Sequence, residues 1–587
     1  MTNAAAWLAV TLLQAGIPGT PGVPGVPGTP GTPGDSSWRR NVDVAVPMRD
    51  SVVLRADVLR PPREGRFPVL VYRTPYGKHD AITDYPTFRR AVERGYAVVV
   101  QDVRGRYASD GTFEPYRLEG RDGYDTIEWA AAQSWSDGRV GTFGLSYPGA
   151  VQWLAAVEGP PHLKAMVPAM TFATPRQFFY SGGAWDLSWS GWVWNNIAPD
   201  LRRRLDAPGP QTAETASAAW KREQSRVLAQ LPLLDLPDFQ GVAPWFHEWM
   251  RREPGDPWWN WAALAGKYDR VNAAVLNLSG WHDEAYGPQG ATVNHQGLVA
   301  AGKRSALVIG PWVHGVAATA RTKSGQREFG PRAAIDYDDT MLRWMDRWVR
   351  GIDNGVDREP AVRAFVMGAN AWRTTNTWPM PGLRADTLYF APSRHLSRAA
   401  PTSDSWASTF VSDPSHPVRD PYDAAYGAHD LRALAGRADV LTFDTAPLAR
   451  DLEVIGAMRA EVHLQTDAPD VDLYVKVLDV APDGTAFNLM SPGLEVVRAS
   501  YREPSKGRQL LEPGRVYALT LGDLYTANRF LKGHRIRVQV MGAFQPHFSL
   551  NLQTGESERT ASATRAARII IRHDRAHPSR LVLPVAP

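Results

Sequence analysis

The chain has 587 residues, no cysteine and a formal charge of only +4. That length is too great for a single hydrophobic core, so two or three domains are expected. The lack of cysteine excludes disulfides, thiolate catalysis and cysteine-ligated zinc. Because the arginines are scattered rather than gathered in a stripe, the basic pI of about 9.1 does not indicate nucleic-acid binding.

The first 40 residues differ from the rest. An apolar run at residues 4–13 has the length of a signal-peptide core, but it is too short to span a bilayer and no basic residues precede it. Glycine then recurs every third residue from Gly16 to Gly34, with too few triplets for a collagen helix. We interpret residues 1–40 as an apolar segment followed by a Pro/Gly-rich tether. A tether favours a periplasmic or secreted location over a cytoplasmic one, and whether the segment is a cleaved signal stays open.

Strand and helix patterns alternate from residue 41 to about residue 175, which is typical of a parallel sheet covered by helices. The apolar run Val98–Val100 is predicted to be a buried strand. Asp122 is predicted to cap the helix that carries Ile127 inward. We therefore assign residues 41–175 to the first part of an α/β domain.

Within that part, Ser146 lies on a predicted turn between a strand and a helix. A short β-rich run, Val140–Phe143, leads into Gly144-Leu145-Ser146-Tyr147-Pro148-Gly149 and then into an apolar helical pattern. A serine on a sharp turn between strand and helix is the nucleophile elbow of α/β-hydrolases. Glycines on both sides allow the strained serine backbone and the close approach of the chain. The alternative is a serine that merely forms a turn.

The pattern changes between residues 176 and 265, which hold ten of the 22 tryptophans. This stretch interrupts the predicted hydrolase sheet between the nucleophile and the acid, and hydrolase folds accept a helical cap at this position. Most of these tryptophans are expected to pack cap helices onto the core, and a minority to line the substrate cleft. The sequence does not say which.

Residues 266–352 supply the partners that a serine nucleophile needs, a histidine base and a carboxylate that orients it. The apolar run Ala274–Leu278 leads to Asp283, and a second run, Ala306–Ile309, leads to His314. The order serine, acid, histidine is that of α/β-hydrolases. The alternative is a surface aspartate and a solvated histidine, but two strand-end positions in the right order favour the triad Ser146–Asp283–His314.

Other histidines compete for the role of base. His282 adjoins the proposed acid, and a neighbouring side chain on a tight loop usually points elsewhere. The remaining candidates lack a preceding strand and are interpreted as structural or surface residues: His79, His162, His247 and His295.

Acyl transfer also needs donors for the oxyanion. One is expected to be the backbone N–H of Tyr147, the residue after the nucleophile. The second should come from the loop after the predicted strand Phe67–Tyr72, which has no glycine run, so the phenol of Tyr76 is the candidate. The alternative is a tyrosine that packs beside a proline turn.

Beyond a polar linker at residues 353–360, the apolar periodicity becomes two, as in Leu473, Val475 and Val477, and turns separate the runs. This pattern predicts an antiparallel β-sandwich over residues 360–587. A role in covering the active-site cleft is favoured over sugar binding.

Several of these stretches together resemble the cocaine esterase group of serine hydrolases, relatives of Xaa-Pro dipeptidyl-peptidases, α-amino acid ester hydrolases and cephalosporin acylases. The matching stretches keep their order from about residue 40 to the end: Arg73-Thr74-Pro75-Tyr76, Gln101-Asp102-Val103-Arg104-Gly105, Asp122-Gly123-Tyr124-Asp125, Gly144-Leu145-Ser146-Tyr147-Pro148-Gly149, Gly280-Trp281-His282-Asp283, Gly310-Pro311-Trp312-Val313-His314 and Lys532-Gly533-His534-Arg535. The resemblance implies the same triad, Tyr76 and the Tyr147 amide as the oxyanion hole, and a jelly-roll sandwich.

The chain is thus predicted to be a serine hydrolase that cleaves esters, or amides, through an acyl-enzyme, without metal or cofactor. A small-molecule ester or amide is the expected partner, with no nucleic acid and no stable membrane span; a homo-oligomer stays open. The amine-recognising relatives carry acidic residues just after the acid, whereas here only Glu284 follows Asp283 and is expected to be a solvated loop residue. This weakens the alternatives of a dipeptidyl-peptidase or an α-amino acid ester hydrolase or acylase. An alternative of another class is a non-catalytic binding protein on the same fold.

Overall fold

The computed structural model describes residues 38–174, 179–284 and 286–587. The apolar segment and nearly all of the tether predicted at residues 1–40 therefore lie outside the described residues. Within the described ranges, no helix is both long and apolar enough to cross a bilayer.

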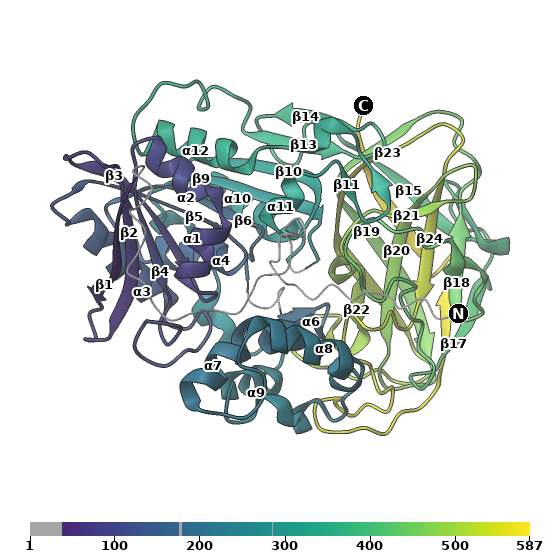
Figure 1. Cartoon of the computed structure of the whole chain (residues 1–587). Coiled ribbons are helices and arrows are strands. Elements are labelled where there is room, and N and C mark those ends of the chain that lie inside the picture. The colour runs from purple at the N-terminus through teal and green to yellow at the C-terminus, as the bar shows by residue number, and fades with distance from the viewer. Residues whose placement is uncertain (1–37, 175–178, 285) are drawn as a thin grey trace, which may run out of the picture.

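The N-terminal body is built on a ten-stranded sheet. Its central strands, from β4 to β13, pair in parallel, and antiparallel strands close both edges (Figure 1). Across the sheet the strands are β1 (Arg39–Pro47), β2 (Val53–Arg60), β4 (Ala97–Asp102), β3 (Phe67–Thr74), β5 (Ser136–Leu145), β6 (Leu163–Ala169), β9 (Ala274–His282), β10 (Ser305–Val313), β13 (Val362–Val366) and β14 (Ala371–Thr375). The predicted α/β fold is confirmed.

Helices cover both faces of this sheet because its strands are apolar on both sides. Successive strand residues alternate between two cores: Val69 and Val71 face one, and Leu70 and Tyr72 the other. The first face is covered by α3 (Glu119–Ala131), α4 (Tyr147–Ala156) and α10 (Gln289–Ala300), the second by α1 (Lys78–Asp84), α2 (Pro86–Glu93), α11 (Val316–Thr319) and α12 (Tyr337–Trp348).

Two details differ from the predictions. Strand β13 pairs with β10 and β14 pairs with β13, so the sheet extends past residue 360, where the sandwich was expected to begin. Asp122 does not cap a helix: α3 starts earlier, after Leu118, and the Asp122 carboxylate instead accepts hydrogen bonds from Arg104 at 2.7 and 2.8 Å. The Asp122 carboxylate therefore binds the buried Arg104 side chain and not the backbone N–H groups at the start of the helix.

The tryptophan-rich stretch forms a helical layer across the C-terminal ends of the strands, at the lower side of Figure 1. Its aromatic rings pack into one cluster that also contacts Tyr147 and Val151 of α4. The elements are β7 (Tyr180–Ser181), β8 (Ala184–Trp185), α6 (Ser188–Trp192), a π-helical turn (Val193–Ile197), α7 (Ala198–Leu205), α8 (Ala213–Leu228) and α9 (Pro244–Arg251). A small hairpin, β11 (Lys323–Ser324) and β12 (Arg327–Glu328), follows β10.

The C-terminal body is the expected β-sandwich, with an apolar core between its layers. Its strands are β15 (Arg384–Ala391), β16 (His395–Ser397), β17 (Ala407–Ser412), β18 (Val440–Asp444), β19 (Leu452–Thr466), β20 (Asp472–Val480), β21 (Ala486–Asn488), β22 (Val496–Arg498), β23 (Val516–Phe530), β24 (Arg535–Met541), β25 (Ala567–Arg572) and β26 (Arg580–Val585).

The sandwich is joined to both other parts by backbone hydrogen bonds. Trp185 and Leu187 of the cap region bond to Ser549 and His547, and Met367 of the hydrolase body bonds to Ala527. The three parts therefore enclose the space above the strand ends, where the candidate site lies.

Candidate active site

Ser146 lies on a strained turn between β5 and α4. Its backbone has φ 68° and ψ −125°, a region that non-glycine residues adopt at a cost of about 1–3 kcal/mol. A Cβ on Gly144 would lie 2.5 Å from Cβ of Pro148, and one on Gly149 would lie 2.7 Å from the carbonyl oxygen of Ala169. Both flanking glycines are therefore required, and the turn presents the serine hydroxyl beyond the end of the sheet.

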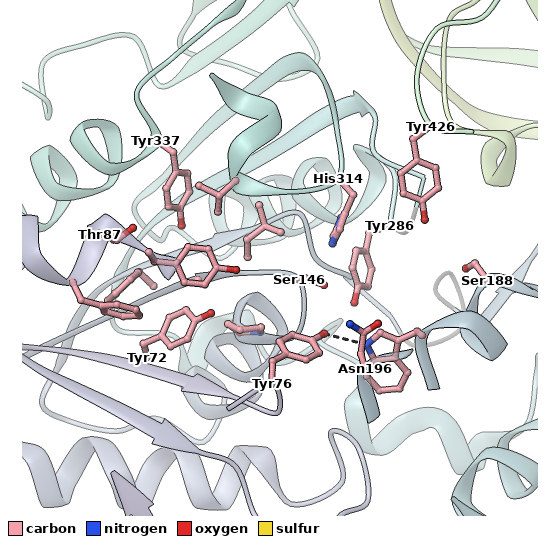
Figure 2. Close-up of a pocket in the computed structure, with 18 of the residues that line it drawn as sticks. Tyr72, Tyr76, Thr87, Ser146, Ser188, Asn196, Tyr286, His314, Tyr337 and Tyr426 are labelled. Carbon is pink, nitrogen blue, oxygen red and sulfur yellow. Dashed lines mark hydrogen bonds between the residues drawn. The ribbon is translucent and has the colours of Figure 1, made fainter. Parts of the chain in front are cut away.

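Asp283 and His314 follow directly after β9 and β10, two neighbouring parallel strands. The Nδ1 atom of His314 lies 2.9 Å from Oδ1 of Asp283. Asp283 is fully buried and His314 is largely buried. Because Nδ1 is engaged by the carboxylate, Nε2 is the nitrogen left to meet a hydroxyl, and Figure 2 shows the imidazole directed toward Ser146.

Tyr76 lies on the opposite side of Ser146 from His314, on the loop after β3 (Figure 2). Its hydroxyl contacts the Ser146 side chain and accepts a hydrogen bond from Nε1 of Trp192 at 3.1 Å. Burial raises the pKa of Tyr76 to about 12, so the phenol stays protonated at neutral pH and can donate. The indole donor occupies a lone pair of the phenol oxygen and leaves the phenol hydrogen for the serine side.

The side chain of Tyr147 points away from the cavity. Its hydroxyl donates to Oε1 of Glu119 at 2.8 Å, and its ring stacks on Tyr116 with centroids 4.3 Å apart. Tyr147 is the first residue of α4, and the first N–H groups of a helix have no acceptor within the helix. The backbone amide is thus the group through which Tyr147 can act near Ser146.

A buried arginine fixes the Tyr76 loop against the cap. Arg106 donates from Nε to the carbonyl of Pro75 at 2.9 Å and from Nη1 to the carbonyl of Ile197 at 2.7 Å. Its side chain is fully buried beside Asp200. No sequence pattern indicates this role, because the two backbone carbonyls that Arg106 binds lie 31 and 91 residues away from it.

Tyr286 is a further residue at the site that sequence reasoning missed. It lies three positions after Asp283, its hydroxyl contacts the side chains of Ser146 and Tyr116, and its ring lies 5.6 Å from the ring of His314. Its place close after the proposed acid was the available signal, but nothing in a single sequence distinguishes such a tyrosine from a packing residue.

Ser146, His314, Tyr76 and Tyr286 open onto one cavity, with about 900 Å³ of empty space including its mouth. Of the cap tryptophans, Trp189 and Trp192 line it. Figure 2 shows Tyr72, Thr87 and Tyr337 of its lining on one side of Ser146, and Ser188, Asn196 and Tyr426 on the other. Among the described lining residues there is no carboxylate, lysine or arginine.

The expectation that Glu284 is a solvated loop residue is wrong. Its Oε1 accepts a hydrogen bond from the backbone N–H of Gly427 at 2.7 Å, and burial raises its pKa well above the usual range. The sandwich loop that carries Gly427 covers it, which no local pattern could reveal. Glu284 and Asp186 line a second cavity, which shares Ser188 and Tyr426 with the first.

The competing histidines lie outside the first cavity. His282 is fully buried against Phe329, and burial lowers its pKa to about 3. His247 bonds to the carbonyl of Leu236 and His295 to the hydroxyl of Ser305, which are structural roles. In the described parts of the chain, no group of three or more His, Cys, Asp or Glu side chains could hold a metal ion.

Known proteins match this chain along nearly its whole length. The family model described as X-Pro dipeptidyl-peptidase (S15 family) matches residues 50–316, and the model of the X-Pro dipeptidyl-peptidase C-terminal non-catalytic domain matches residues 354–582. The cocaine esterase of Rhodococcus sp. (strain MB1 Bresler) is 33% identical over 94% of this chain and 99% of that protein.

Two solved structures share the fold. An α-amino acid ester hydrolase superposes with a TM-score of 0.82 at 24% identity, covering 95% of this chain and 98% of the other. An aminopeptidase from a marine sediment archaeon, Thaumarchaeota archaeon, superposes with a TM-score of 0.80 at 23% identity, covering 96% and 99%. With the family models and the esterase relative, the α/β-hydrolase fold with a C-terminal β-rich domain is common to all of them, and the chain belongs to the cocaine esterase family of serine hydrolases.

Proposed function

We propose that Ser146, His314 and Asp283 are the catalytic triad of this serine hydrolase, and that the phenol of Tyr76 and the backbone N–H of Tyr147 form its oxyanion hole. The observation that carries the proposal is the 2.9 Å contact between His314 Nδ1 and a fully buried Asp283, with the imidazole facing Ser146 across the cavity.

The steps follow from these positions. Nε2 of His314 takes the hydroxyl proton of Ser146 as Oγ attacks the ester carbonyl, and Asp283 holds the tautomer and stabilises the imidazolium. The carbonyl oxygen becomes negative and is held by Tyr76 and the Tyr147 N–H. His314 gives its proton to the departing alcohol. Water then attacks the acyl-enzyme, with His314 again as base.

We further propose that the substrate is an ester whose group near the serine is uncharged, bulky and partly aromatic. The aromatic walls and the lack of any charged side chain among the described residues of the first cavity support an uncharged group. The name of the 33%-identical relative supports an ester rather than an amide.

A second candidate, an ester or peptide with a free amino group, is favoured by Asp186 and Glu284 in the adjoining cavity. Burial raises the pKa of Asp186 to about 7 and that of Glu284 well above its usual range, which reduces the negative charge of both carboxyls and weakens their attraction for an ammonium group. The uncharged ester is therefore the first choice.

A side-by-side panel tests both candidates: p-nitrophenyl esters, aminoacyl p-nitroanilides and Xaa-Pro-nitroanilides, with Ser146→Ala as the blank. We expect the highest kcat/KM for the neutral esters. Faster cleavage of the nitroanilides would reject the ester assignment in favour of the peptidase alternative. Turnover by Ser146→Ala equal to that of the wild type would reject the triad.

A further inference from the structure

Tyr286 places a second phenol at Ser146, in addition to Tyr76. Figure 2 shows its hydroxyl directed toward Ser146, from the side that faces the cap and the sandwich. The phenol contacts the serine side chain and also the phenol of Tyr116. Tyr286 is buried, with an exposed fraction of 7%.

Two hydrogen bonds hold Gly287, the residue after Tyr286. The backbone N–H of Gly287 donates to the carbonyl of Asp283 at 2.7 Å, and the hydroxyl of Ser279 donates to the carbonyl of Gly287 at 3.1 Å. The ring of Tyr286 packs against His314 at 5.6 Å and against Trp189 at 6.3 Å. Asp283, which orients the histidine, is therefore hydrogen-bonded to the residue that follows Tyr286.

Tyr116 holds the hydroxyl group of Tyr286 in place. Tyr116 is buried and stacks on Tyr147, and its backbone N–H donates to the Tyr147 hydroxyl at 3.0 Å. Each phenol has one hydrogen to donate. If Tyr116 donates to the oxygen of Tyr286, the hydrogen of Tyr286 is directed at Oγ of Ser146, while the serine hydrogen is directed at His314.

We propose that Tyr286 is a catalytic residue that donates a hydrogen bond to Oγ of Ser146 and thereby assists the departure of Oγ when the acyl-enzyme is hydrolysed. The inference rests on the proposed triad. During acylation Oγ loses electron density to the carbonyl carbon, so a donor at Oγ gives no help. During deacylation the C–Oγ bond breaks and Oγ gains negative charge, so the same donor stabilises the transition state.

Atoms and protons balance in this step. Water attacks the acyl carbon and gives a proton to Nε2 of His314; the tetrahedral intermediate collapses, the C–Oγ bond breaks, and Oγ takes that proton from His314. The phenol keeps its hydrogen throughout and contributes only the hydrogen bond. Tyr76 acts on a different atom, the carbonyl oxygen, so the two tyrosines should differ in their kinetic effects.

Quench-flow with p-nitrophenyl acetate, read by intact mass spectrometry, measures how fast the acetyl adduct forms and how fast it disappears. Tyr286→Phe keeps the ring against His314 and Trp189 and removes only the hydroxyl. We expect deacylation to slow about tenfold, the effect of losing one hydrogen bond, with acylation changed by less than about threefold. In the steady state, kcat and KM should then fall together where deacylation limits turnover, and kcat/KM should stay nearly constant. Tyr474→Phe, which removes a buried phenol of β20 that lines neither cavity, is the matched control and should change neither rate.

Two results would overturn the role of Tyr286. One is an unchanged deacylation rate in Tyr286→Phe; the other is an equal loss in both steps, which a packing defect or a shared oxyanion contact would cause. A wild-type protein that forms no adduct on Ser146 would instead overturn the triad, and the Tyr286 role with it. A decrease confined to deacylation, absent from Tyr474→Phe, supports the proposal.

Discussion

Replacing Tyr76 by phenylalanine removes one hydroxyl and tests the oxyanion hole most sharply. The phenol hydrogen is aimed toward the serine side because Trp192 donates to the phenol oxygen from 3.1 Å. A preorganised oxyanion donor lowers the barrier by about 3–4 kcal/mol. We therefore expect kcat for a p-nitrophenyl ester to fall about 100- to 1000-fold in Tyr76→Phe, with KM nearly unchanged.

The same substitution should also destabilise the fold by a smaller amount. It leaves the buried indole N–H of Trp192 without its acceptor, which costs about 1–3 kcal/mol. Trp192→Phe removes the indole donor instead and should lower kcat far less than Tyr76→Phe does, because the phenol hydroxyl remains. Stopped-flow rates with chemical-denaturation curves separate the two effects. A kcat for Tyr76→Phe within about threefold of the wild type would refute the donor role and leave the triad intact.

Three further results are expected. Asp283→Asn should lower kcat by about 10³- to 10⁴-fold, because the histidine loses the carboxylate that fixes its tautomer; a loss below tenfold would contradict this. Burial raises the pKa of Asp186 from 3.8 to about 7, so its contribution to stability is complete below about pH 4 and is lost as the pH rises toward 7, on the order of 4 kcal/mol in all. Asp186→Asn should therefore raise the free energy of unfolding relative to the wild type at pH 8 but not at pH 4, as measured by urea denaturation. An equal difference at both pH values would contradict the raised pKa of Asp186 as the cause. Gly149→Ala should lower Tm by several degrees, because its Cβ would meet the Ala169 carbonyl at 2.7 Å, whereas Gly436→Ala, with open space around it, should not.

The elements that the sequence predicts well are those whose signals are local. The elbow at Ser146 is marked by its glycines, and the acid and the histidine each follow an apolar run that the structure forms as β9 and β10. The hydrolase fold and the C-terminal sandwich followed from these patterns and from the resemblance.

The features that the sequence could not reveal depend on contacts between distant segments. The burial of Glu284 requires the loop at Gly427, which is 143 residues away. Apolar and polar residues alternate along β20, but both of its faces are buried, since Lys476 pairs with Glu495 and Asp472 with Arg498. Local periodicity reports which residues are apolar, whereas these polar side chains are buried because charged partners from other segments reach them.

The sheet to which β13 and β14 belong could not be predicted for a related reason. Strands β13 and β14 carry the short alternating pattern of sandwich strands, and only the pairing of β13 with β10 and of β14 with β13 assigns them to the hydrolase sheet. Pairing partners are set by the tertiary arrangement, and a two-residue period is the same in either sheet.

Labelling with a fluorophosphonate, followed by peptide mapping, directly tests whether Ser146 is the nucleophile that His314 activates. We expect one covalent adduct, on Ser146, that is absent in Ser146→Ala and forms at least about 100-fold more slowly in His314→Ala, since the histidine activates the hydroxyl. An adduct on another serine, or a labelling rate at Ser146 that does not depend on His314, would contradict it.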